Sequence, residues 1–291
     1  MSFKNRIFVL VQYIVPKHLL SRLIGILAEC RISWLKTTFI TWFVHHYDVN
    51  MDDAFIEDIE DYDSFNAFFT RTLKTSVRPI PDGDRYILSP ADGTISQIGN
   101  IKQGRIFQAK GHEYHLAALL GGNENHALMF SGGAFATVYL SPRDYHRVHM
   151  PVTGSLREMT FIPGKLFSVN DISVRLVPNI FARNERVVCL FDTMHGPMAI
   201  ILIGAMIVGS IVTTWAGQIN SQEQRVKSVR YKEFANKTFQ LERGEELGHF
   251  KLGSTVIVLF GPGRVNWRDT LGAGDSVRFG QEMGSARDDG S

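Results

Sequence analysis

The pattern of apolar and polar residues divides the chain into a helical N-terminal region and a β-rich remainder. Apolar side chains recur at helical spacing in two successive runs, Leu19, Leu20, Leu23, Ile24 and Leu27, then Trp34, Leu35, Phe39, Trp42 and Phe43. From about Ser89 onward, short apolar runs such as GTISQIG, FATVYL, RVVCLF and TVIVLF are separated by clusters of Gly, Pro, Asn and Asp. This pattern predicts an α+β fold, with amphipathic helices and a connector over residues 1–63 and a mainly antiparallel β-rich domain over residues 64–291.

The longest uncharged run, PMAIILIGAMIVGSIVTTWAG over residues 197–217, is nearly long enough to cross a bilayer. Gly204 and Gly209 divide it into short pieces rich in Ile, Val and Thr, which favours two or three buried strands. A membrane span stays open as the alternative. Residues 220–243 have the character of a polar surface excursion and residues 272–291 that of a frayed end, so no role is assigned to either.

Charge is sorted along the chain, although the formal net charge is only +2. Residues 1–47 carry a local charge of +5, with Glu29 as the single acid, whereas the charged residues of 48–63 are all acidic and predict a solvated connector. The basic amphipathic region either packs on the rest of the protein or docks on an anionic membrane surface. Its apolar run over residues 7–15 is too short for a span and precedes no small-residue cleavage site, which argues against a signal peptide. A transit peptide stays open because no acid precedes Glu29.

Composition excludes several classes of protein. A chain of 291 residues that is 44% hydrophobic and 21% charged can bury a large core, so a globular body of enzyme size is expected. No basic stripe with interleaved aromatic residues stands out, which argues against a nucleic-acid partner. Cys30 and Cys189 cannot form a disulfide framework and neither lies in a CxxC motif, so a reducing compartment fits best.

Three motifs supply candidate catalytic side chains. Ser254 lies at the start of a buried apolar run in ELGHFKLGSTVIVLF, Asp92 lies in SPADGTI, and His146 and His149 lie in SPRDYHRVHMP. An Asp, a His and a Ser can act as orienting group, base and nucleophile if the fold brings them together, which spacing alone does not show. The plain alternatives are a turn residue for Ser254 and an Asx turn for Asp92. The two histidines lack further ligands nearby, so no metal site is predicted.

The chain resembles the bacterial phosphatidylserine decarboxylases nearly end to end. The likeness rests on SPADGTISQIG, QAKGHEYHLAALL, YLSPRDYHRVHMPVTG, PGKLFSVN, FARNERVVCLFDT and GHFKLGSTVIVLF taken together, since LGST alone would be weak. The resemblance implies a proenzyme that cuts itself between Gly253 and Ser254, giving a β chain of residues 1–253 and an α chain of residues 254–291. It further implies that Asp92 and His149 serve the cut, and that Ser254 becomes a covalent pyruvoyl group, so that no external cofactor is required.

The chemistry that this resemblance implies can be written residue by residue. Ser254 Oγ, deprotonated by His149, attacks the carbonyl of Gly253, while Asp92 fixes the tautomer of the imidazole. The amine of phosphatidylserine then forms a Schiff base with the pyruvoyl carbonyl, which accepts electrons as CO2 departs and phosphatidylethanolamine is left. We expect His146, as a group that titrates near neutrality, to return a proton to the substrate.

Partners and location follow from the same resemblance. The expected partners are phosphatidylserine, anionic membrane lipid and the protein's own cleaved fragment in an α/β heterodimer, with homo-oligomers left open. The expected location is the cytoplasmic face of a bacterial inner membrane, held peripherally by residues 1–47. Two rival functions stay open: a serine hydrolase, which would keep Ser254 intact, and a non-enzymatic membrane-bound β domain, which would neither cut itself nor release CO2.

Overall fold

The computed structural model describes residues 3–109, 111–206, 210–219, 223–231, 239–251 and 254–287. The α-helices within these ranges are α1 (Phe3–Ile14), α2 (Lys17–Ala28), α3 (Ser33–Tyr47), α4 (Phe65–Phe69), α5 (Leu116–Leu119), α6 (Glu124–Phe130), α7 (Asp171–Leu176) and α8 (Ile180–Arg183). The strands are β1 (Tyr86–Leu88), β2 (Gly93–Asn100), β3 (Arg105–Ala109), β4 (His112–His115), β5 (Ala134–Leu140), β6 (Arg147–His149), β7 (Gly154–Ile162), β8 (Arg186–Thr193), β9 (Gly196–Ile203), β10 (Ser210–Thr213), β11 (Gly217–Gln218), β12 (Lys227–Arg230), β13 (Gln240–Leu241), β14 (Glu246–Lys251), β15 (Ser254–Phe260), β16 (Val265–Trp267), β17 (Ser276–Val277) and β18 (Glu282–Ala286).

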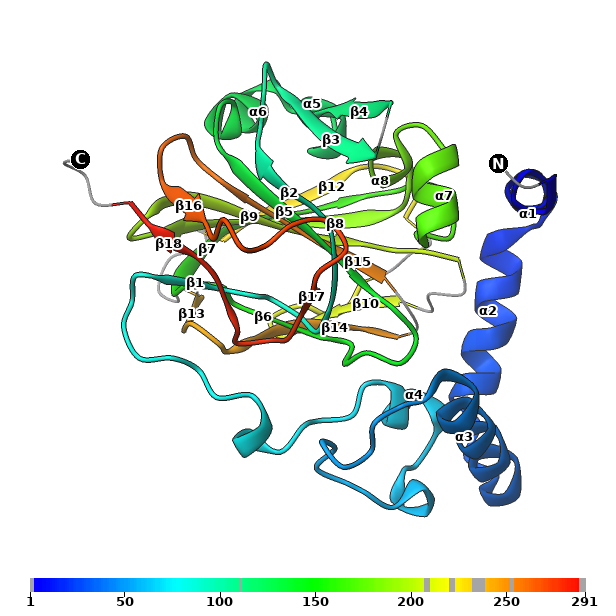
Figure 1. Ribbon diagram of the computed structural model, residues 1–291. Helices are drawn as coiled ribbons and strands as arrows, with labels where there is room; N and C mark the ends of the chain where they lie inside the picture. The colour runs from blue at the N-terminus through cyan, green and yellow to red at the C-terminus, as the bar shows by residue number, and fades with distance from the viewer. Residues whose placement is uncertain are drawn as a thin grey trace.

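A large antiparallel sheet forms the centre of the molecule (Figure 1). Among the described residues its strand order is β12-β7-β8-β9-β15-β5-β2-β17, with β13 paired to β7. The strand β15 lies between β9 and β5 and is buried along its whole length. Its sequence STVIVLF explains this position, because β-branched and aromatic side chains suit a strand that is covered on both faces.

Two hydrophobic cores cover the two faces of this sheet. Alternate side chains of β15 enter different cores: Val256 and Val258 belong to one, and Ile257 and Leu259 to the other. The first core includes residues of the smaller sheets, which have the orders β1-β18-β16 and β11-β10-β14-β6. The second includes residues of α5 to α8 and of the β3–β4 hairpin, which Figure 1 shows on the opposite side.

The N-terminal helices α1, α2 and α3 run along one side of this β-rich body (Figure 1). A third hydrophobic core joins α3 and the end of α2 to α4, with Phe43, Phe65 and Phe68 among its members. Farther toward the N-terminus, α1 contacts α7 through Gln12, whose side-chain amide donates to Ser173 Oγ at 3.1 Å. The helices are therefore tied to the β-rich body at both ends.

The predicted α+β fold is confirmed, and the described part of residues 197–217 contributes to the strands β9, β10 and β11, as expected. The strand β9 is buried in the large sheet, and β10 pairs with β14. No single helix in the described part of the chain is long and apolar enough to cross a membrane; α1 and residues Leu19–Ala28 meet that test only as a pair bent by 92°.

The prediction of a frayed C-terminal end is wrong for residues 272–287. Within this stretch β17 pairs with β2, and β18 pairs with both β1 and β16. The polar, glycine-rich sequence gave no strand signal for two reasons. The strand β17 has only two residues, and β18 contains a glycine, beside which the ring of Trp267 packs, in place of an apolar run. Residues 223–231 and 239–243 also contribute strands, β12 and β13, to the edge of the large sheet.

Candidate active site

Ser254 occupies the first position of the central strand β15. Its backbone pairs with Leu140 of β5, and its side chain is only 1% exposed. The Ser254 hydroxyl has no hydrogen-bond partner in the part of the chain that the structure describes. A buried hydroxyl without a partner costs about 1–3 kcal/mol, so the fold keeps this group at the expense of stability. Gly253, the other residue of the predicted cut, lies outside the described residues.

His146 lies in the connection between β5 and β6 and is wholly buried. Its Nε2 is 3.0 Å from the carbonyl oxygen of Ser141, and because a carbonyl only accepts, Nε2 carries the hydrogen. The other ring nitrogen, Nδ1, has no partner among the described residues and is left with a free lone pair. Since Ser141 directly follows Leu140, His146 is anchored one residue from the strand partner of Ser254.

His149 ends β6 and has partners on both ring nitrogens. Its Nδ1 donates to the carbonyl oxygen of Gly244 at 2.8 Å, so Nε2 accepts from the Tyr145 hydroxyl at 3.0 Å. The ring of Phe279 stacks on the imidazole with 3.6 Å between ring centres. His149 also lines a cavity of about 460 Å³, so this histidine, unlike His146, faces an open space.

Asp92 is held by Arg78 and by the backbone of the C-terminal segment. Its Oδ1 accepts from Arg78 Nε at 3.1 Å and from the amide of Phe279 at 2.7 Å, and Oδ2 accepts from the same guanidinium. Asp92 was expected to fix the tautomer of the His149 imidazole; in the structure the Gly244 carbonyl accepts from Nδ1 and sets that tautomer. Asp92 still acts on His149 through its negative charge, which raises the pKa of the imidazole against larger opposing effects.

Burial lowers the pKa of both histidines well below 6.5. Desolvation is the largest cause for each; the positive charge of Arg71 adds to it at His146, whose pKa falls to about 3. The pKa of His149 falls to about 4, although the hydrogen bond to Gly244 opposes the shift. Both rings are therefore neutral at pH 7 and can accept a proton. The expectation that His146 titrates near neutrality is wrong, because its ring is enclosed by Phe69 and other buried groups.

The four predicted side chains form two neighbouring groups. Asp92 and His149 meet around Phe279, and Ser254 and His146 meet around the end of β5. The adjacent residues Tyr145 and His146 connect the groups along the chain. No hydrogen bond joins His149 to Ser254 within the described ranges, and the structure therefore shows the parts of the predicted triad without their final contact.

Several residues at the site were not predicted from the sequence. Arg78 follows the acidic connector and gave no signal, while Phe279 lies in the segment that was expected to fray. Tyr145 stands inside the quoted motif SPRDYHRVHMP and could have been noticed as a hydroxyl beside two histidines. Gly244 contributes only a backbone carbonyl, which no side-chain pattern can reveal.

Comparison with known proteins gives concordant matches over most of the chain. The family model described as "Phosphatidylserine decarboxylase" matches residues 65–285, and a second, described as "PSD", matches residues 7–48. A protein of Stutzerimonas stutzeri named "Phosphatidylserine decarboxylase proenzyme" is 58% identical, over 97% of this chain and 95% of its own length. Proteins of the same name from Pseudomonas aeruginosa and Pseudomonas putida are 58% and 56% identical, over 97% and 96% of this chain and 97% and 98% of theirs.

Proposed function

Since the chain belongs to the phosphatidylserine decarboxylase family, we propose that it cuts itself between Gly253 and Ser254 and then converts phosphatidylserine into phosphatidylethanolamine and CO2. The observation that carries the self-cleavage is the Ser254 hydroxyl, which is buried at the start of the central strand and has no partner in the described residues. A hydroxyl kept in this state has no structural use, and its free lone pairs and proton are those that a nucleophile needs.

The residues around Ser254 fit a covalent pyruvoyl group made from it. That group would take the place of the orphaned Ser254 hydroxyl, and β15 would fix it through register pairing with β5 and β9. When formed, the pyruvoyl group supplies a carbonyl that accepts the electron pair of the bond broken as CO2 leaves.

For the cut, His149 acts as the base and Ser254 as the nucleophile. The His149 ring is neutral, and among the described residues its Nε2 accepts a hydrogen bond only from the Tyr145 hydroxyl. This nitrogen takes the Ser254 proton as Oγ forms a bond to the Gly253 carbonyl carbon. The Gly253–Ser254 amide bond breaks when its nitrogen receives that proton, and an ester is left. Loss of the Ser254 α-proton expels the Gly253 carboxylate, and hydrolysis of the remaining enamine releases ammonia. Asp92 stabilises the imidazolium that forms in the first step.

During turnover, His146 transfers a proton from the amino group of the substrate to its α-carbon. The lone pair of its Nδ1 is free among the described residues, and the pKa of about 3 means that a proton taken from the substrate ammonium is held there only transiently. The imidazolium thus formed is a strong acid in this buried site, and it returns the proton to the α-carbon after CO2 has left. His146 is neutral again at the end of each cycle, and the product amine takes up one proton from water, which supplies the proton that the overall reaction consumes.

The cut products stay together as an α/β heterodimer. Residues 254–291 begin with the strand β15, which pairs on both sides with strands from residues 1–253. The same segment supplies Phe279, whose backbone and ring contact Asp92 and His149. Each chain therefore contributes to one active site.

Membrane association places the site near its lipid substrate. The N-terminal helices expose large apolar side chains, among them Phe3, Leu10, Ile14, Ile26 and Trp34. Together with the local charge of +5 over residues 1–47, these side chains suit peripheral docking on an anionic bilayer, which in a bacterium is the cytoplasmic face of the inner membrane. In addition, Lys251 of β14 pairs with Glu29 just after α2 at 2.8 Å, which connects the docking helices to the segment that leads to Ser254.

The test is the intact mass of the purified chain beside that of Ser254→Ala. The native sequence should give two fragments, residues 1–253 and 254–291, the second resistant to Edman degradation because it has no free amine. Ser254→Ala should give one chain and no CO2 from phosphatidylserine. An uncut native chain that reacts with an inhibitor of activated serines would instead identify a serine hydrolase, and cutting of Ser254→Ala at the same bond would remove Ser254 as the nucleophile.

A further inference from the structure

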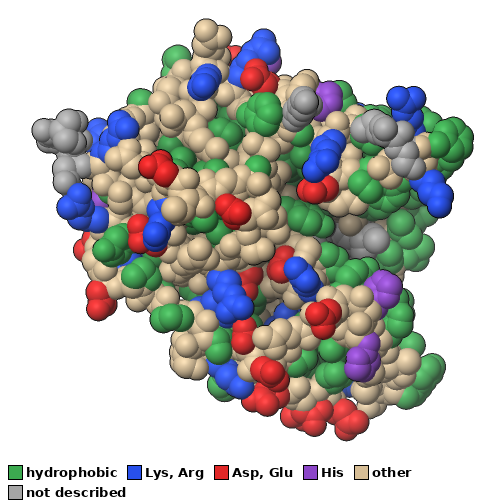
Figure 2. All heavy atoms as spheres, in the orientation of Figure 1, with side chains coloured by type: hydrophobic (Ala, Val, Ile, Leu, Met, Phe, Trp, Pro, Cys, Tyr) green, Lys and Arg blue, Asp and Glu red, His purple; other side chains and the backbone are tan. Residues whose placement is uncertain are grey.

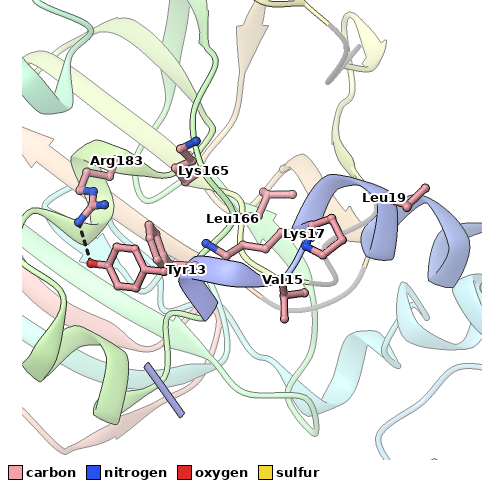
Figure 3. A pocket seen from close by; sticks show the side chains of 9 residues that line it. Tyr13, Val15, Lys17, Leu19, Lys165, Leu166 and Arg183 are labelled. Carbon is pink, nitrogen blue, oxygen red and sulfur yellow. Dashed lines mark hydrogen bonds between the residues drawn. The ribbon is translucent and has the colours of Figure 1, made fainter. Parts of the chain in front are cut away.

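A cavity of about 390 Å³ lies where the turn between α1 and α2 meets the β-rich domain (Figure 3). Lys17 lines it from the N-terminal helices, and Lys165 and Arg183 line it from the domain. The aromatic rings of Tyr13 and Phe167 form part of its wall. The cavity is thus built by two regions that lie far apart in the sequence.

The three cations at this cavity have no carboxylate partner in the described part of the chain. None of the residues lining it is acidic, and no ion pair joins Lys17, Lys165 or Arg183 to a carboxylate within the described ranges. By contrast, Arg78 and Arg147, near the catalytic histidines, each pair with a carboxylate. A cluster of positive charge without acids is the arrangement that binds an anion.

Of the three cations, Lys17 gives the strongest indication of a bound anion. Its side chain is only 8% exposed, and its ammonium lies 3.4 Å from the centre of the Phe167 ring without a hydrogen bond to any described residue. Arg183 lies against the same ring and donates to the Tyr13 hydroxyl at 3.3 Å. Burial, together with the charges of Lys165 and Arg183, lowers the pKa of Lys17 to about 8. A bound anion would oppose the repulsion between these cations.

The surface beside the cavity indicates which anion fits. Leu19 lines the cavity and is itself exposed, and Ile14 and Leu23 on the same two helices are exposed as well. Figure 2 shows hydrophobic side chains gathered on the side of the molecule where these helices lie. An occupant with a phosphate group and hydrocarbon chains matches both parts, since its charge would enter the cavity and its chains would cover the exposed apolar surface.

We propose that Lys17, Lys165 and Arg183 bind the phosphate group of an anionic membrane phospholipid, whose acyl chains lie against the exposed apolar side chains of α1 and α2. This site deepens the membrane docking of the proposed function, and it does not depend on the cut or on the pyruvoyl group. A lipid held there would fix the orientation of the catalytic domain at the bilayer, because the cavity joins the docking helices to that domain.

The test compares the double variant Lys165→Gln/Arg183→Gln with the matched control Lys4→Gln/Arg6→Gln, whose cations are exposed on α1 outside the cavity. Binding is measured by flotation with vesicles of phosphatidylcholine alone and of phosphatidylcholine mixed with phosphatidylglycerol. At high salt, where exposed charges are screened within about 3–5 Å, we expect the cavity variant to bind the mixed vesicles about tenfold more weakly than the native protein and the control to stay within about twofold. Equal losses in the two variants would show diffuse surface attraction and overturn the proposal.

Two further measurements test the site if the double variant is unstable or if the ligand is free phosphate. Lys17→Met keeps an unbranched apolar stem over Phe167 and removes the charge, so it should weaken binding in the same direction if the double variant does not fold. Inorganic phosphate is the second probe. Suppose that it raises the melting temperature of the native protein but not of the Lys165→Gln/Arg183→Gln variant, while vesicle binding is the same in both proteins. The site then binds free phosphate, and the lipid assignment is wrong.

The uncut Ser254→Ala chain separates this proposal from the proposed function. It should bind the mixed vesicles as the native protein does, because the cavity needs no maturation. Failure of the native chain to cut itself would remove the proposed function and leave this comparison intact, whereas loss of vesicle binding in Ser254→Ala alone would tie the site to the cut and contradict the proposal.

Discussion

His146 and His149 lie three residues apart, yet their surroundings differ in almost every respect. His146 is wholly enclosed, stacks on Phe69 and keeps one ring nitrogen without a partner in the described chain. His149 faces a cavity, and both of its nitrogens are hydrogen-bonded, to Gly244 and Tyr145. The His146 ring is therefore enclosed but has one ring nitrogen without a hydrogen bond to any described residue, whereas the His149 ring lines a cavity but has hydrogen bonds on both nitrogens.

This difference gives a reason for two histidines in a chain where one base could serve both reactions. The cut is a single event in the life of the molecule, so its base can depend on a rearrangement that breaks the Tyr145 hydrogen bond once. Decarboxylation recurs with every substrate, and a free Nδ1 in a fixed ring needs no rearrangement between cycles. Each of the following experiments changes one of the two surroundings while leaving the other in place.

The largest effect is expected on the cut itself. His149→Gln should slow self-cleavage by about 10²–10⁴-fold, the usual contribution of a general base, whereas His146→Gln should slow it less than about tenfold. A time course of fragment formation after cell-free synthesis measures both rates under identical conditions. If His146→Gln blocks the cut and His149→Gln does not, the two assignments must be exchanged.

The second effect concerns turnover by the mature enzyme. Matured His146→Gln should release CO2 from phosphatidylserine about a hundredfold more slowly than the native enzyme, because the substrate loses its proton acceptor and donor. Only fully cut protein is assayed, so that slow maturation is not mistaken for slow catalysis. A native rate in that material would exclude His146 from proton transfer.

The third experiment removes the support of Asp92 on the His149 side. Arg78→Gln leaves a buried carboxylate without its ion pair, and we expect about 3 kcal/mol of lost stability together with a slower cut. Lys74→Gln is the matched control, because Lys74 pairs with Glu57 at an exposed position and should change stability by less than about 0.5 kcal/mol. Chemical denaturation in the Ser254→Ala background measures both; similar small changes would mean that Asp92 is adequately solvated without Arg78.

The acid sensitivity of the fold should come from both histidines. Their pKa values are about 3 and 4 in the folded protein but 6.5 when unperturbed, so the unfolded chain binds more protons as the pH falls below 6.5. The neutral imidazoles therefore contribute stability above that pH, and the contribution is lost progressively as the pH falls through 6.5 toward 4 and 3. In Ser254→Ala chains, replacing either histidine with Gln should reduce the loss between pH 7 and pH 4 by about 3 kcal/mol. An unchanged slope in both variants would contradict neutral burial.

The smallest effect is expected from Tyr145→Phe. Loss of the hydroxyl frees His149 Nε2, and we expect the cut to keep its rate within about threefold, since a neutral hydrogen bond contributes only about 1 kcal/mol. The rate is followed as for the histidine variants. A tenfold or larger decrease would show that Tyr145 relays the proton between Ser254 and His149.

Prediction from the sequence succeeded where chemistry or periodicity is local. The run STVIVLF identified β15, and the motifs around Ser254, Asp92 and His149 identified the family. It failed where contacts join distant segments: Phe279 reaches Asp92 across 187 positions, and the low pKa of His146 depends on Phe69 and Arg71. A polar, glycine-rich tail shows little strand pattern because its strands are short: β17 has two residues, and β18 has five, one of them a glycine.

If the chain is cut before Ser254 as proposed, the central position of β15 also makes unfolding of the mature protein kinetically irreversible. Before the cut, the chain folds by a unimolecular reaction in which residues 254–260 are always tethered to their neighbours β5 and β9. After it, an unfolded molecule consists of two chains, and refolding requires a short fragment to find the middle of a sheet that has closed or collapsed without it. The working lifetime of the mature protein is therefore set by how rarely it unfolds, and the uncut precursor carries the only efficient route to the native structure.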